Sequence, residues 1–286
     1  MEQPRQVTRL IEPQFVVEGA GVKLRRSMPQ RVLDYLDPFL LFDHFASDDP
    51  ADYLAGFPMH PHRGIETVTY MLAGVVNHQD SLGNAGSIQA GDVQWMTSGR
   101  GIMHEEMPKP HDGKMAGFQL WVNLPAKLKM TRPRYQEVPS NIIPEAKRKD
   151  GVRIRVIAGK ANGVQGPVTE IYADPAYLDV TIPAGVSFTH PIEPGHTAFA
   201  YVFEGKGKFG ITDTEGGTTV SQPRLVSFGD GDHVRIAASE EAVRFLLVSG
   251  KPLNEPVARY GPFVMNTRQE IEQALLDLRN GTFVQP

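Results

Sequence analysis

The chain consists largely of short apolar runs separated by Gly, Pro, Asn or Asp, and this pattern restricts the folds open to it. Each run is too brief for a typical helix and is rich in β-branched or aromatic residues, which indicates strands. The 28 Gly and 23 Pro supply the turns between them. Strands at this spacing, without long helical patterns in between, predict an all-β barrel or sandwich. The runs that indicate strands most clearly are residues 67–72, 92–96, 117–122, 152–158, 177–182, 198–203 and 243–248.

One helix is expected near the C-terminus. Thr267 and Glu270 have the spacing of a capping box, in which two side chains satisfy backbone N–H groups at the helix start. Asn280 and Gly281 supply a stop. The apolar residues between these signals fall on one face, so we expect the helix to pack as a strap on a barrel. They are Ile271, Ala274, Leu275 and Leu278.

Two pairs of segments suggest an internal repeat. Residues 67–74 and 198–205 both run through apolar or small residues, share a Tyr at the same place and end in Gly. Further along, Ala-Gly-Asp at 90–92 has a counterpart in Phe-Gly-Asp at 228–230. Similarity at a fixed separation predicts the duplication of one barrel.

The boundary between the halves is placed where the composition changes. Between Pro125 and Asp150 the chain becomes basic and loop-like, as expected of a solvated linker, with a surface for an anion or a partner as the alternative. We therefore expect an N-terminal metal-binding barrel in residues 1–130, a linker in 131–150, and a C-terminal barrel with the final helix in 151–286.

Composition excludes several classes of function. The sequence has no Cys, which removes disulfides, thiolate metal ligands and cysteine nucleophiles, and this suits a reducing compartment. The formal net charge of −4 does not favour a nucleic-acid partner. The first ten residues lack the apolar core of a secretory signal, and no stretch approaches the roughly 20 apolar residues that span a bilayer. We expect a cytoplasmic protein without membrane or nucleic-acid partners.

Three of the nine histidines fall in two short clusters that can share one metal ion. In an extended segment, residues two apart point to the same face, so His60 and His62 can present both imidazoles on one side. His104 and Glu106 repeat this spacing. Glu66 has the same parity as His60 and His62, and it remains a rival to Glu106, which we prefer. We expect the two segments to face each other across a barrel mouth.

The donor set predicts the type of metal. Imidazole suits Fe, Ni, Cu and Zn, and a carboxylate adds charge. Without thiolates, a closed structural zinc site is not expected. Four protein ligands on a metal that prefers six leave two positions for water, O₂ or a chelating substrate. We expect Fe(II), with Ni, Mn, Cu or Zn as alternatives.

The remaining histidines are expected to have structural or surface roles. The repeat places Pro191 and Glu193 opposite His60 and His62, so we expect no metal in the C-terminal barrel. The histidines in question are His44, His78, His111, His190, His196 and His233.

Residues 60–69, His-Pro-His-Arg-Gly-Ile-Glu-Thr-Val-Thr, resemble the first metal motif of the pirins, a family of the cupin superfamily. This resemblance implies two stacked, jelly-roll-like cupin barrels. It also implies iron in the first barrel, held by His60, His62, His104 and Glu106, and none in the second. The resemblance covers residues 25–281, with further matching motifs at 91–97, 99–108, 117–124 and 261–267.

The resemblance implies two kinds of function. Some pirins resemble quercetin 2,3-dioxygenases, which open a flavonol ring with O₂. Others resemble iron-dependent, redox-sensing regulators that bind protein partners without catalysis. We expect the dioxygenase, with Glu106 as a ligand that can also accept the substrate's hydroxyl proton. A scaffold with hydrogen-bonded histidines is the third interpretation. Four apolar residues are expected to form a dry slot for a planar ring: Phe57, Met59, Met103 and Phe118.

Overall fold

The computed structural model of the protein describes residues 3–109 and 113–285, so His111 lies outside the described residues. Within these ranges strands dominate, and the α-helix α1 (Arg268–Arg279) follows them near the C-terminus. The expected all-β class with a C-terminal helix is confirmed. In the part of the chain that the structure describes, no helix has the length and apolar character needed to span a membrane.

The chain forms two compact units, each assembled from three segments. The N-terminal barrel unit contains Gln14–Gln30, Pro38–Ser140 and Leu253–Pro286. The C-terminal barrel unit contains Met1–Pro13, Arg31–Asp37 and Asn141–Pro252. The units therefore differ from the expected boundaries at both ends of the chain. The first residues belong to the C-terminal barrel unit, and the last residues belong to the N-terminal one.

The N-terminal barrel unit is built from two antiparallel sheets. The larger has seven strands in the order β12-β9-β6-β11-β4-β3-β2, and the smaller has the order β5-β10-β7-β8. A short hairpin, β23-β24, completes the unit. The strands are β2 (Gln14–Glu18), β3 (Val22–Met28), β4 (Phe39–Ser47), β5 (Phe57–His62), β6 (Ile65–Ala73), β7 (Val75–Asp80), β8 (Ala85–Gln89), β9 (Val93–Thr97), β10 (Ile102–Pro108), β11 (Met115–Asn123), β12 (Arg134–Val138), β23 (Ala258–Tyr260) and β24 (Phe263–Met265).

The C-terminal barrel unit has one large antiparallel sheet with an apolar interior. Its main path is β1-β21-β19-β22-β17-β14-β13, with β18 on β22 and β20 on β19. Aromatic rings such as Phe188, Phe209 and Phe245 fill the core. The strands are β1 (Val7–Ile11), β13 (Glu145–Lys147), β14 (Arg153–Ala158), β15 (Lys160–Ala161), β16 (Val164–Gln165), β17 (Ala176–Ile182), β18 (Ser187–Pro191), β19 (Thr197–Phe209), β20 (Thr218–Ser221), β21 (Arg224–Phe228) and β22 (His233–Gly250).

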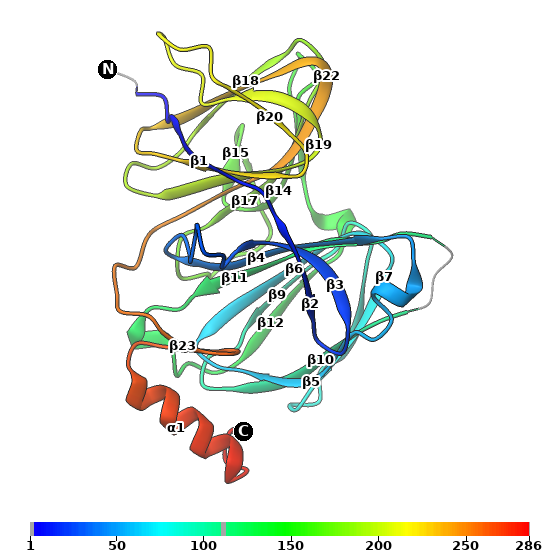
Figure 1. Ribbon diagram of the computed structural model, residues 1–286, viewed down its shortest axis with the longest axis vertical. Coiled ribbons are helices and arrows are strands. Elements are labelled where there is room, and N and C mark those ends of the chain that lie inside the picture. The colour runs from blue at the N-terminus through cyan, green and yellow to red at the C-terminus, as the bar shows by residue number, and fades with distance from the viewer. Residues whose placement is uncertain (1–2, 110–112, 286) are drawn as a thin grey trace. The chain divides into compact units, whose positions relative to one another are not determined.

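The C-terminal helix begins at the expected capping box. The Thr267 hydroxyl accepts a hydrogen bond from the Glu270 backbone N–H, and the Glu270 carboxylate accepts one from the Thr267 backbone N–H. Ile271 and Ala274 are buried against β24, whereas Leu278 is 38% exposed. The helix thus packs as a strap on the N-terminal barrel unit, beside β23 in Figure 1.

Candidate metal centre

The two histidine clusters lie on neighbouring strands of the smaller sheet. Strands β5 and β10 pair antiparallel, with His60 opposite His104 and His62 opposite Ile102. The expectation that the segments face each other across a barrel mouth is therefore wrong. Because directly opposed residues of paired strands point to the same side, adjacency alone brings the imidazoles together.

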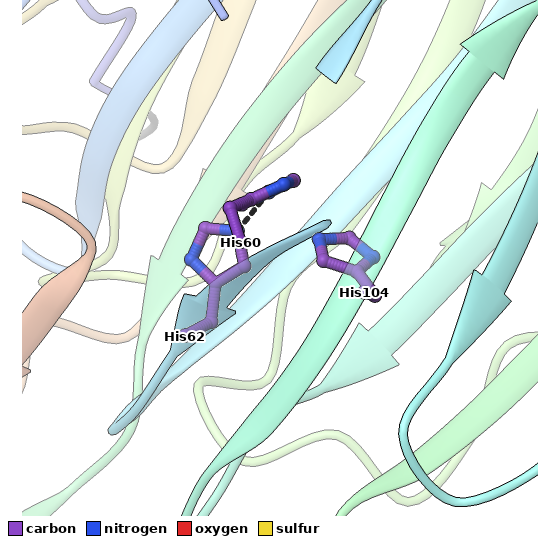
Figure 2. Close-up of side chains that lie close together, drawn as sticks. All are labelled: His60, His62 and His104. Carbon is purple, nitrogen blue, oxygen red and sulfur yellow. Dashed lines mark hydrogen bonds between the residues drawn. The ribbon is translucent and has the colours of Figure 1, made fainter. Parts of the chain in front are cut away.

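The three imidazoles converge at one point. Among the described residues, His60, His62 and His104 form a group whose ligand atoms all lie within 4.8 Å of one another. Their ring centroids are 4.4 to 5.1 Å apart. Figure 2 shows the rings of His60 and His62 turned toward each other, with His104 alongside. This spacing allows nitrogen atoms from three rings to contact one cation.

Hydrogen bonding fixes the orientation of His60. Its Nδ1 donates to the backbone oxygen of Pro58 at 2.9 Å, because a carbonyl oxygen can only accept. The Nε2 of His60 lies 3.0 Å from Nε2 of His62. A backbone partner on one ring nitrogen, with the other nitrogen turned toward the neighbouring imidazoles, is the usual arrangement of a metal-binding histidine.

Burial keeps the other two rings neutral. It lowers the pKa of His62 well below its usual range, and the His104 and His60 rings lower it further. Burial also lowers the pKa of His104, with contributions from His60 and His78. Within the described residues, neither ring nitrogen of His104 has a hydrogen-bond partner, although the residue is only 1% exposed. Unpartnered buried nitrogens with free lone pairs fit a bound metal ion.

Glu106 lies on the same strand as His104 but outside the histidine group. It has the parity of His104 and is 9% exposed. The Thr69 hydroxyl lies 3.0 Å from its Oε1. Glu106 also lines the cavity next to the histidines, so its carboxylate is available at the edge of the cluster.

The rival carboxylate, Glu66, lies in a different environment. Glu66 and Thr69 are three residues apart on β6, so their side chains point to opposite faces of the sheet. Its Oε1 accepts a hydrogen bond from the Thr97 hydroxyl at 2.7 Å. Burial raises the pKa of Glu66 to about 7. Because Thr69 contacts Glu106 beside the histidines, Glu66 faces away from the cluster.

The turn after His62 is held by the surrounding backbone. Gly64 has a φ of +82°, and a Cβ there would lie 2.0 Å from the backbone oxygen of Val264. The buried Nζ of Lys129 donates to the oxygens of Gly64 and Val264 at 2.9 and 2.8 Å, and to Asn123 Oδ1 at 2.7 Å. This clamp joins the end of β5 to the C-terminal segment.

A cavity of about 550 Å³ opens beside the histidines, a size that suits a small organic molecule. Trp121 stands edge-on to His62 with ring centroids 5.2 Å apart, and the Arg259 guanidinium lies over the Trp121 ring. Of the expected slot residues, Phe57 lines the cavity, whereas Phe118 stacks on Phe42 on the other face of the larger sheet. The lining comprises mainly apolar side chains, including Val22, Leu24, Leu41, Phe45, Tyr53, Val76 and Met115.

Three residues lie next to the cluster to which sequence reasoning gave no role there. His78 lies opposite Glu106 in the β7–β10 pair and is buried with its Nε2 2.7 Å from Glu137. Thr69 and Gln119 lie on the larger sheet and contact each other below Glu106. Nothing in the local sequence marks these residues, because their proximity depends on the register between strands.

Comparison with known proteins identifies the family. The Pirin family model matches residues 21–122, and the Pirin C-terminal cupin domain matches residues 177–284. A pirin-like protein of Caulobacter vibrioides is 45% identical over 280 residues, covering 98% of this chain and 99% of that protein. Human pirin is 42% identical over 282 residues, covering 98% of this chain and 94% of that protein.

A solved structure gives the same result. The crystal structure of a quercetin 2,3-dioxygenase from Acinetobacter baumannii superimposes with a TM-score of 0.88 at 35% sequence identity, covering 98% of this chain and 99% of that one. The similarity covers both barrel units, including the histidine-bearing strands β5 and β10 of the N-terminal one. On this evidence the protein belongs to the pirin family.

Proposed function

We propose that the protein is a metal-dependent dioxygenase that opens a flavonol-type substrate with O₂. The proposed metal is Fe(II), with Ni, Mn, Cu or Zn as alternatives, and the proposed ligands are His60, His62, His104 and Glu106. The observation that carries the proposal is the convergence of three imidazoles beside a cavity that Glu106 also lines. The similarity to a quercetin 2,3-dioxygenase supports the reaction class.

The cavity accounts for the type of substrate. Its apolar walls favour a planar aromatic ring, since burying apolar surface contributes about 25 cal/mol per Å². His60, His62 and Glu106 all line the space, as do the polar side chains of Arg26, Asp43, Thr69 and Gln119. A substrate with two adjacent oxygens on its ring would place these oxygens at the histidines and its remaining ring against the apolar wall.

The chain's own residues have three roles in this proposal. The histidines hold the metal, which when bound would supply Lewis acidity and redox chemistry to the substrate and O₂. Glu106 accepts the proton of the substrate hydroxyl, because a carboxylate at the cavity edge is within reach of it. Trp121 and Phe57 exclude water from the reacting oxygens, since both line the same end of the cavity.

The test is aerobic turnover of quercetin by protein loaded anaerobically with Fe(II). We expect oxygen uptake by the wild type and a loss of at least 100-fold in kcat for His62→Ala, since a missing ligand disrupts the centre. Full activity in His62→Ala would contradict the proposal. Metal binding without turnover of any flavonol would favour the alternative, an iron-dependent regulator that binds protein partners.

A further inference from the structure

A row of polar residues crosses the inner face of the larger sheet in the N-terminal barrel unit. Cross-strand pairing places its members side by side on consecutive strands, from β12 through β9, β6, β11 and β4 to β3. In that order they are Glu137, Gln94, Thr69, Gln119, Asp43 and Arg26. Four of them line the cavity: Thr69, Gln119, Asp43 and Arg26.

The middle of this row lies deep inside the barrel, whereas Glu137 at its end is exposed. Thr69 and Asp43 are each 3% exposed, and Gln94 is 2% exposed. Both oxygens of Asp43 have a partner, because Nε and Nη2 of Arg26 donate to them at 2.9 and 2.7 Å. Buried polar networks add little net stability compared with well-packed apolar residues, so a row of this length requires another explanation.

The centre of the row contacts the proposed metal ligand. Thr69 Oγ1 lies 3.0 Å from Glu106 Oε1 and 2.8 Å from the side-chain oxygen of Gln119. A hydroxyl has one proton, so it cannot donate to both acceptors. An amide can be turned so that its NH₂ replaces its oxygen. With Glu106 ionised, Gln119 therefore donates to Thr69, and Thr69 donates to Glu106.

We infer that Thr69 is a positioning residue for Glu106, and that Gln119 orients the Thr69 hydroxyl. The inference rests on the proposed function, because it gives Glu106 the role of metal ligand. The larger sheet thereby sets the direction of a carboxylate carried by the smaller sheet. A ligand side chain held by such a partner binds its metal more tightly than a free one, since less orientational freedom is lost on binding.

The experiment uses Co(II) as a probe of the centre in the full-length protein. Co(II) binding is titrated anaerobically, and its visible absorption bands report the number and geometry of ligands. The variants are Thr69→Val, which removes the hydroxyl at nearly constant shape, and Thr69→Ser, which restores it. Thr67→Val is the matched control, because Thr67 lies on the same face of β6 opposite Met96 and Trp121.

We expect Thr69→Val to raise the Kd for Co(II) by about 10- to 100-fold and to shift the absorption bands. Thr69→Ser and Thr67→Val should both match the wild type. Gln119→Met removes the amide while leaving Thr69 in place, and it should weaken Co(II) binding by several-fold. If Thr69→Val does not fold, the Kd of Gln119→Met for Co(II) tests the positioning role in its place.

Two results would overturn the inference, and they can be told apart. An unchanged Kd and spectrum in Thr69→Val, or in Gln119→Met if Thr69→Val is unfolded, removes the positioning role alone, provided that His62→Ala has lost Co(II) binding. If the wild type itself does not bind Co(II), or His62→Ala binds it equally well, the proposed metal centre fails and the positioning role fails with it.

Discussion

The guanidinium of Arg63 is 2.6 Å from the carboxylate of Asp277, so the residue after His62 is bonded to the C-terminal helix. Arg63 is 1% exposed and its guanidinium also stacks on the Phe283 ring at 4.5 Å. The end of the histidine-bearing strand β5 and the helical strap are therefore connected by a buried ion pair that no local sequence signal indicates.

Removing the carboxylate at Asp277 should destabilise the protein. Asp277→Ala leaves the buried Arg63 charge without its partner, and breaking a buried pair in this way costs about 3–5 kcal/mol. We expect the free energy of unfolding, measured with urea, to fall by an amount near the lower end of this range, because the Asp277 side chain is 16% exposed. Glu272→Ala is the control on the same helix, since its bridge to Arg268 is exposed and should contribute less than about 1 kcal/mol. Equal losses of stability in Asp277→Ala and Glu272→Ala would show that the buried ion pair does not hold the helix on the barrel unit.

The turn at Gly64 should tolerate no side chain. Gly64→Ala adds a Cβ that would lie 2.0 Å from the Val264 oxygen, in addition to the strain of a φ of +82°. Gly83→Ala carries similar strain at a φ of +89° but meets nothing within 4 Å. We expect Gly83→Ala to cost about 1–2 kcal/mol and Gly64→Ala clearly more, measured by urea unfolding. Comparable losses of stability in the two variants would show that the close contact with the Val264 oxygen adds nothing to the strain of the positive φ.

Glu66 should make stability fall as pH rises. Burial raises its pKa in the folded protein from the usual 4.5 to about 7, so the folded state binds more protons than the unfolded state between these values. Its unfavourable contribution therefore grows from pH 4.5 to 7 and is constant above. The free energy of unfolding of Glu66→Gln should therefore rise relative to that of the wild type by about 3 kcal/mol over this range. A difference between the two proteins that does not change with pH would contradict this assignment.

Local sequence patterns predicted the features that depend on neighbouring residues. Alternation along a strand correctly placed His60 with His62, and the capping box correctly placed the start of α1. The repeat pairing of Tyr70 with Tyr201 holds in the sense that both lie on buried strands, β6 and β19. The Gly-Asp match does not hold, because Gly91 precedes β9 whereas Gly229 follows β21.

Features that depend on strand order could not be predicted. The adjacency of β5 and β10, and the contact of Thr69 with Glu106, follow from pairing between segments distant in sequence. The position of the strap follows from the burial of Arg63 by Asp277 and Phe283, again far apart along the chain. The register between distant strands cannot be read from a single sequence. Periodicity and helix capping can, because they depend on residues close together in the chain.

The central claim is that His60, His62 and His104 together hold one metal ion, and anaerobic Fe(II) titration with metal analysis tests it most directly. The wild type should bind a single equivalent, and His62→Ala and His104→Ala should each lose it. His196→Ala, in the C-terminal barrel unit, is the control and should bind as the wild type does. Undiminished Fe(II) binding by His62→Ala and His104→Ala would contradict the account.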